Sequence, residues 1–168
     1  AQRVEVQDGG EARFACYVLG RAQDGGLPHL GCDKPCCVLA RRSGHVETPA
    51  CLGIHDTQTD RLVLIEATPA IEAQVAMLQD YSGVHRRGRA PVDAILLTHA
   101  HVGHYAGLIH LGREVASTSA MPLCVTPRMA EFLASNGPWS QLVDLGQVDL
   151  QEIIVGEPFE PIEGLSVT

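Results

Sequence analysis

The apolar residues of the chain fall into short runs, which predict buried β-strands. Most runs are bounded by glycine or polar turn residues and are too short for a typical helix. The run at 62–65 has no polar alternation, as expected for a strand buried on both faces, and polar residues 56–60 before it predict a hairpin. The expected strands are 14–20, 51–55, 62–65, 94–97, 122–125, 148–155 and 165–168.

Two Thr-Pro pairs predict the starts of helices, at 68–69 and 126–127. Threonine is a frequent N-cap, and proline at the first helical position loses no hydrogen bond. After the first pair, Ile71, Val75 and Leu78 recur at helical spacing, which gives that helix one apolar face. A third helix is expected over 104–111. Short strands that alternate with helices predict an α/β (α+β) layered fold.

Length and charge narrow the class of protein. The 168 residues suit a single domain, and the net charge of −8 argues against binding to nucleic acid or to an anionic membrane surface. The basic patch at 86–89 is interpreted as a solvated loop, and no apolar segment approaches the length of a membrane span. The start at Ala1, without methionine, favours an exported, periplasmic protein over a trimmed cytoplasmic chain.

Three histidines follow the apolar run 94–97 and form the main chemical motif of the chain. His99, His101 and His104 lie within six residues, directly after a predicted strand. Imidazole nitrogen is a common ligand for zinc and suits iron, copper and nickel, and residues two apart on an extended chain can converge on one ion. The pattern predicts a metal site with His99 and His101 as its first ligands.

Residues 97–108 resemble the signature of the metallo-β-lactamase superfamily, in which a strand ends in Thr-His-x-His-x-Asp-His and runs into a glycine-containing helix. Segments 18–20, 24–28 and 67–74, with the cysteines after residue 31, are similar to the pyrroloquinoline quinone biosynthesis protein B branch. The resemblance implies an αββα sandwich with metals at one edge of its two sheets.

Several features of the resemblance concern the end of the chain. Family members carry a third histidine for the first metal, a bridging aspartate and a last histidine, but no histidine follows His110 here. The strand near 164–167 looks like the one that precedes the third histidine. We therefore expect residues 1–168 to be one domain, incomplete at its C-terminus, with the remaining half of the sandwich after Thr168.

Gly103 stands where the family signature has an aspartate that helps to hold the second metal. Glycine offers no side-chain ligand, so the resemblance implies one zinc ion on His99, His101 and a later group, rather than a full two-zinc site. His104 would then be a ligand of a weak second site or would orient a small-molecule substrate.

The metal site is compatible with three functions. The first is a hydrolase, in which the metal acidifies a bound water that attacks a carbonyl or phosphoryl centre. The second is an oxidoreductase that uses one iron ion on the same histidines, as the quinone-cofactor branch suggests. The third is a non-catalytic carrier whose site has decayed at Gly103.

A second cluster consists of Cys32, Cys36 and Cys37. These thiols could hold a structural zinc, with His29 or another thiol as the fourth ligand, and the resembling branch has a cysteine-rich zinc knuckle near this place. In an exported protein they could instead form disulfides with one another or with Cys51. The remaining cysteines, in apolar strand patterns, are interpreted as buried residues.

Four other polar or aromatic residues are interpreted from their positions in the pattern. His110 is expected to face away from the motif, as a packing or surface residue. Asp24, beside two glycines, could line the mouth of a pocket or simply form a turn. Tyr105 could point into the pocket or the core, and Trp139 is expected in the core.

Overall fold

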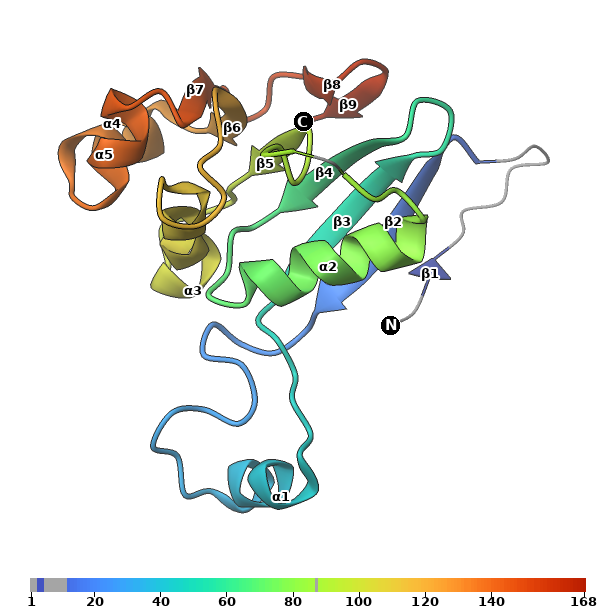
Figure 1. Ribbon diagram of the computed structural model, residues 1–168, viewed down its shortest axis with the longest axis vertical. Helices are drawn as coiled ribbons and strands as arrows, with labels where there is room; N and C mark the ends of the chain where they lie inside the picture. Colours follow the sequence, from blue (N-terminus) through green and yellow to red (C-terminus); the bar gives the residue numbers. More distant parts are fainter. Residues whose placement is uncertain (1–2, 5–11, 87) are drawn as a thin grey trace.

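The computed structural model describes residues 3–4, 12–86 and 88–168 of the chain. Its centre is a seven-stranded sheet in which the strands lie side by side in chain order (Figure 1). The first four strands pair antiparallel, and β4 to β7 pair parallel. The strands are β1 (Arg3–Val4), β2 (Phe14–Gly20), β3 (Cys51–Asp56), β4 (Arg61–Ile65), β5 (Ala94–Leu96), β6 (Met121–Val125) and β7 (Val148–Glu152).

Helices cover one face of this sheet. They shield a core that is centred on completely or nearly completely buried strand residues. Those strand residues are Leu62, Leu64, Ile95 and Leu123. The covering elements are α2 (Ile71–Ser82), α3 (Val102–Tyr105), the 3-10 helix η1 (Ala106–Leu111), α4 (Pro127–Ser135) and α5 (Trp139–Asp144).

The opposite face of the sheet is covered by a hairpin of β8 (Phe159–Ile162) and β9 (Leu165–Val167). Ile162 of this hairpin packs in a second apolar cluster with Val63 of β4. Phe14, Ile54 and Ile65 flank the same cluster and are only partly buried. The sheet thus has one well-covered face and one face that is covered in part.

The segment between β2 and β3 makes an excursion that carries α1 (Pro35–Ser43) away from the sheet (Figure 1). Two isolated bridges join the outgoing and returning chains, one of them between Leu27 and Glu47. Leu30, Leu39 and Val46 on this excursion are exposed. Within the described part of the chain, no helix is long and apolar enough to cross a membrane.

The mixed α/β architecture confirms the predicted fold class, and the predicted strands correspond to β2 to β7 and β9. The strand expected to reach Val155 ends at Glu152. Four elements were not predicted from the pattern, namely α1, α5, β8 and the short β1. Trp139 is partly buried and packs against the core, in contact with Tyr105 and Phe132. Tyr105 is buried in the core, the second of its two predicted positions.

The helix after Thr68 starts later than predicted. Thr68 and Pro69 lie before the first helical residue, Ile71. The Thr68 hydroxyl accepts a hydrogen bond from the Ala70 backbone N–H (3.1 Å) and donates one to Gln74 (2.6 Å). Thr68 therefore organises the turn into α2 rather than capping its first residue directly.

The expected helix over 104–111 is in fact two pieces, α3 and η1. The backbone N–H of Gly107 donates to the carbonyl of Ala67 (2.8 Å), which lies on the segment after β4. This N–H would bond to residue 103 in a continuous α-helix, so the contact with Ala67 ends the α-helical ladder. The break ties the histidine segment to the end of β4.

The β3–β4 turn holds a closed polar network. Asp56 is completely buried and accepts hydrogen bonds from Arg13 (2.8 Å to Nη2), the Gln58 backbone N–H (3.0 Å) and the Thr59 hydroxyl (2.8 Å). Arg13 also donates to the carbonyl of Glu163 (2.8 Å), in the β8–β9 turn. This network fastens the hairpin of β8 and β9 to the sheet.

Candidate metal centre

The histidine motif lies at the edge of the sheet where the parallel strands β4 and β5 both end. Ile65 pairs with Leu96, and the backbone N–H of Glu66 donates to the carbonyl of Leu96 (2.8 Å). The residues that follow the two strands are therefore neighbours, as at the carboxyl edge of other parallel sheets where ligands bind. Glu66 follows β4, and Thr98 and His99 follow β5.

Helix α3 returns His104 to this edge. The backbone N–H of Ala67 donates to the carbonyl of His104 (2.8 Å), and that of Gly107 donates back to Ala67 (2.8 Å). A Cβ atom on Gly107 would lie 2.0 Å from the carbonyl oxygen of Thr68, so only glycine permits this close approach. The backbone contact fixes His104 beside the end of β4.

The structure brings the three predicted histidines together. The ring centroid of His99 lies 4.5 Å from that of His101 and 4.1 Å from that of His104, and the His101 and His104 centroids are 6.4 Å apart. The side chain of His101 is 72% exposed, whereas that of His104 is 13% exposed. The cluster thus has an open side at His101 and a covered side at His104.

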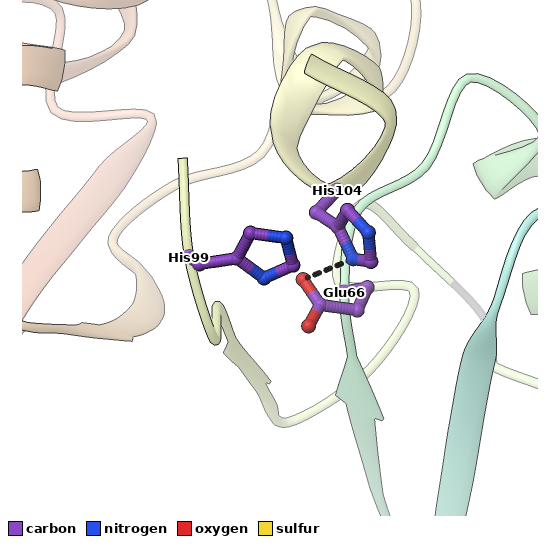
Figure 2. A group of neighbouring side chains, drawn as sticks. All are labelled: Glu66, His99 and His104. Atoms are coloured by element: carbon purple, nitrogen blue, oxygen red, sulfur yellow. Dashed lines mark ion pairs between the residues drawn. The ribbon is translucent and has the colours of Figure 1, made fainter. Parts of the chain in front are cut away.

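Glu66 forms the floor of the cluster and was not among the predicted site residues (Figure 2). Its backbone has a positive φ of 78°, an uncommon conformation that costs energy outside glycine. Its carboxylate accepts hydrogen bonds from the hydroxyl and the backbone N–H of Thr98 through Oε1. The other oxygen, Oε2, lies 3.4 Å from Nδ1 of His104.

Thr98 links Glu66 to His99. Its hydroxyl donates to Glu66, so its oxygen remains an acceptor for the N–H of His99 Nδ1, 2.8 Å away. A proton on Nδ1 leaves Nε2 of His99 with a free lone pair. Such partners orient imidazole ligands and fix their tautomers in metal sites, so this chain of contacts prepares His99 for a metal ion.

Asp24 approaches the cluster from the loop after β2. Its carboxylate lies 3.3 Å from Nε2 of His104 and 3.6 Å from Nδ1 of His101. Partial desolvation raises the pKa of Asp24, but a backbone hydrogen bond and the two histidines outweigh it, so the pKa ends below its usual value. Asp24 lies in a turn, one of the two interpretations of the sequence, and its carboxylate faces the histidines.

The donor atoms have the chemistry and spacing of a transition-metal site. One ligand atom from each of Glu66, His99 and His104 can be chosen so that all lie within 4.8 Å of one another, a group that does not include the predicted ligand His101. Glu66 Oε2 and His104 Nδ1 are 3.4 Å apart, so the carboxylate can orient this ring and leave Nε2 for a metal ion. Neither atom has a hydrogen-bond partner among the described residues. The residues therefore fit a bound divalent ion.

The cysteine cluster has a different environment. Cys36 and Cys37 lie side by side in α1, with Cys36 exposed and Cys37 buried, while Cys32 precedes the helix. Arg41 donates to the carbonyls of His29 and Cys32 and so holds that loop to the helix. All six cysteines lie in the described ranges and are free thiols.

No cysteine belongs to the one group of potential ligands that meets the metal-site spacing in the described part of the chain. The structural zinc on Cys32, Cys36 and Cys37 stays a prediction. His110 lies outside the histidine cluster and pairs with Glu72 (3.1 Å) on α2, as its assignment to a packing or surface role anticipated.

Comparisons with known proteins agree with this geometry. Residues 61–168 match the family model described as a beta-lactamase superfamily domain. The chain is 31% identical over 157 residues to the coenzyme PQQ synthesis protein B of Methylobacterium nodulans and 34% identical over 157 residues to that of Methylobacterium radiotolerans. Both alignments cover 90% of this chain and 50% of the relative, so the chain spans about half the length of these curated relatives.

Solved structures give the same result. The crystal structure of Zn(2+)-bound PqqB from Methylobacterium extorquens superimposes with a TM-score of 0.76 at 30% identity, over 91% of this chain and 54% of that one. A diphosphatase from the PhnP family superimposes with a TM-score of 0.65 at 22% identity, over 92% of this chain and 55% of that one. The second likeness concerns the fold alone.

Proposed function

Because this chain belongs to the metallo-β-lactamase superfamily and is similar to its PqqB branch, we propose that it is the metal-binding part of a metal-dependent hydrolase. His99, His101 and His104 hold one or two zinc ions in this proposal. The observation that carries it is the convergence of these three rings at the sheet edge, over a buried carboxylate with one unpartnered oxygen.

Each residue of the centre has a distinct role in the proposal. A zinc ion held there would supply a Lewis acid that polarises a carbonyl or phosphoryl group and acidifies water. His99 and His101 offer nitrogens at the open side of the cluster, where a small-molecule substrate has access. Glu66, through Thr98, orients His99 and holds a negative charge beside His104. Catalysis needs this fixed orientation because misplaced ligands lose metal affinity.

The proposed enzyme includes a further part of the domain. The relatives are about twice as long as this chain. Phe14, Ile54 and Ile65 leave a partly buried apolar face on the sheet, on the side away from the helices. Two sheets that pack face to face bury such surfaces. A second sheet on this face would complete the αββα sandwich and could bring the later metal ligands to the centre.

A second candidate is a role in synthesis of coenzyme PQQ, either as an iron-dependent oxidoreductase or as a non-catalytic carrier. The observation that favours it is the name that the curated relatives share, coenzyme PQQ synthesis protein B. Three protein ligands with open positions also suit non-haem iron. The Zn²⁺ bound in the crystal structure of the similar PqqB favours zinc over iron in this proposal.

Metal identity and turnover separate these candidates. The purified protein is analysed for zinc, iron and manganese per chain, and then assayed with a chromogenic phosphodiester and a chromogenic ester, before and after chelation. The hydrolase proposal expects zinc and a hydrolysis rate that chelation removes and zinc restores. Oxygen consumption with iron would support the oxidoreductase instead, and bound metal without any turnover would support the carrier.

A further inference from the structure

Gly103 is buried in α3, between two of the histidines, and its lack of a side chain makes room for another residue. A Cβ atom at this position would lie 2.3 Å from Cβ, 2.5 Å from Cα and 2.7 Å from the carbonyl oxygen of Asp24. The φ of Gly103 is not positive, so the backbone conformation does not demand glycine. Glycine is required because a side chain at position 103 would collide with Asp24, which fills this space.

The loop that carries Asp24 is fastened to its surroundings on both sides. Ala22 donates its backbone N–H to the carbonyl of Thr48 (3.1 Å). Leu27 and Glu47 exchange a pair of backbone hydrogen bonds of 2.8 and 2.9 Å. These contacts hold both ends of the loop to the returning segment at residues 47–48. Between them, the backbone of Asp24 lies directly against Gly103 of α3.

From this position the carboxylate of Asp24 reaches two histidines at once. Its Oδ1 lies 3.3 Å from Nε2 of His104 and its Oδ2 lies 3.6 Å from Nδ1 of His101, so each contact is near the ~3.3 Å separation of two zinc ligands. The contact with His104 is a hydrogen bond, and at 3.3 Å it is longer than the charge-assisted hydrogen bonds of about 2.7–2.9 Å. Glu66 lies at the other nitrogen of His104, Nδ1, so Nε2 is the nitrogen that faces Asp24.

We propose that Asp24 is a further metal-binding residue of this centre, whose carboxylate enters through the space left by Gly103 and binds a divalent transition-metal ion together with His101 and His104. This inference rests on the proposed metal site. It means that Gly103 is not a sign of decay, because the carboxylate comes from a different loop. Position 103 and position 24 are then a coupled pair, in which a side chain at 103 displaces the ligand at 24.

The first test is the dissociation constant for Zn²⁺, measured by competition with a chromophoric chelator. Asp24→Asn keeps the size of the side chain and removes its charge, and we expect zinc binding at least tenfold weaker, within the 10–100-fold range for disturbed metal shells. Glu72→Gln is the matched control, because Glu72 is an acidic residue that pairs with His110 outside the centre. This variant should bind zinc as the wild type does. Zinc binding by Asp24→Asn within twofold of the wild type would overturn the proposal.

The second test uses Gly103→Ala and the double variant with Asp24→Asn. We expect Gly103→Ala alone to weaken zinc binding about as much as Asp24→Asn, and the double variant to be no weaker than the stronger single effect, because both changes remove the same ligand. Full additivity would overturn the coupling. The visible spectrum of the Co²⁺-loaded protein should change in Asp24→Asn, which a purely structural role of Asp24 would not produce.

The two proposals fail in different ways. If His101→Ala weakens zinc binding and Asp24→Asn does not, Asp24 is no ligand and the histidine centre stands. If the wild type binds no zinc at the histidines, so that His101→Ala has no effect, the proposed function and the role of Asp24 fall together.

Discussion

Two buried carboxylates lie at opposite ends of the hairpin formed by β3 and β4, and their surroundings differ. Asp56, at the turn, has hydrogen-bond donors on both oxygens, from Arg13, Gln58 and Thr59. Glu66, at the far end of β4, has Thr98 on one oxygen, while the other has no hydrogen-bond partner among the described residues and faces a histidine. A buried charge is costly unless it is paired. The closed network serves the fold, and the open one marks the functional site.

The largest expected effect is a loss of stability when the hydrogen-bond network of Asp56, at the β3–β4 turn, is removed. Asp56→Ala leaves the guanidinium of Arg13 and the donors of Gln58 and Thr59 without their acceptor, and should lower the free energy of unfolding by about 3 kcal/mol. Urea unfolding curves measure this loss. Zinc content per folded chain should not change, because the turn lies at the other end of the hairpin. A loss below about 1 kcal/mol would contradict the structural role given to this network.

Glu66→Gln should give the opposite result. The amide keeps the oxygen that accepts from Thr98, so the free energy of unfolding should change by less than about 1 kcal/mol. The negative charge beside His104 is lost, and zinc binding should weaken about 10–100-fold. Chelator competition and urea unfolding are measured on the same preparation. If Glu66→Gln is less stable than Asp56→Ala but binds zinc normally, the roles of the two carboxylates are reversed.

The pH dependence of stability should also be set in part by Asp56. The hydrogen bonds from Arg13, followed by those from Thr59 and Gln58, lower the pKa of Asp56 well below its usual range, against the opposing effect of burial. A depressed folded-state pKa stabilises the protein above the unfolded pKa of about 3.9, and this contribution is lost as the pH falls toward the folded value. Urea midpoints should therefore fall more steeply below about pH 4 in the wild type than in Asp56→Asn. Equal slopes would contradict the assignment.

The smallest effect is expected at Thr98, which connects Glu66 to His99. Thr98→Val keeps the shape of the side chain and removes both hydrogen bonds of the hydroxyl. We expect zinc binding to weaken by up to about tenfold, since partners of metal ligands tune affinity by this order. Thr57→Val, at the turn near Asp56, is a matched control, because its hydroxyl bonds only to backbone carbonyls. It should leave zinc binding unchanged.

The local pattern was sufficient to predict strands β2 to β7 of the sheet and the histidine motif. The strand residues 62–65 are apolar on both sides because helices cover one face and the β8–β9 hairpin part of the other. The three histidines are close in sequence, so a strand that ends at the sheet edge brings them together. These features depend on neighbours within a few residues, which the sequence displays directly.

The carboxylates of the site depend on distant contacts and could not be predicted as well. Glu66 follows an apolar strand, and its partner Thr98 is more than thirty residues away; an acid directly after a buried strand was the available signal. Asp24 lies in a glycine-rich turn, and its contact with Gly103 joins residues that are far apart in the sequence. The break between α3 and η1 likewise results from a distant carbonyl, that of Ala67.

The metal content of three proteins shows whether the motif histidines form a metal centre. The wild type, His101→Ala and His110→Ala are purified in the same way and analysed for zinc, iron and manganese per chain. His110 is the control because it pairs with Glu72 outside the cluster. We predict bound metal in the wild type and in His110→Ala, and its loss in His101→Ala. The same metal content in all three proteins would contradict it.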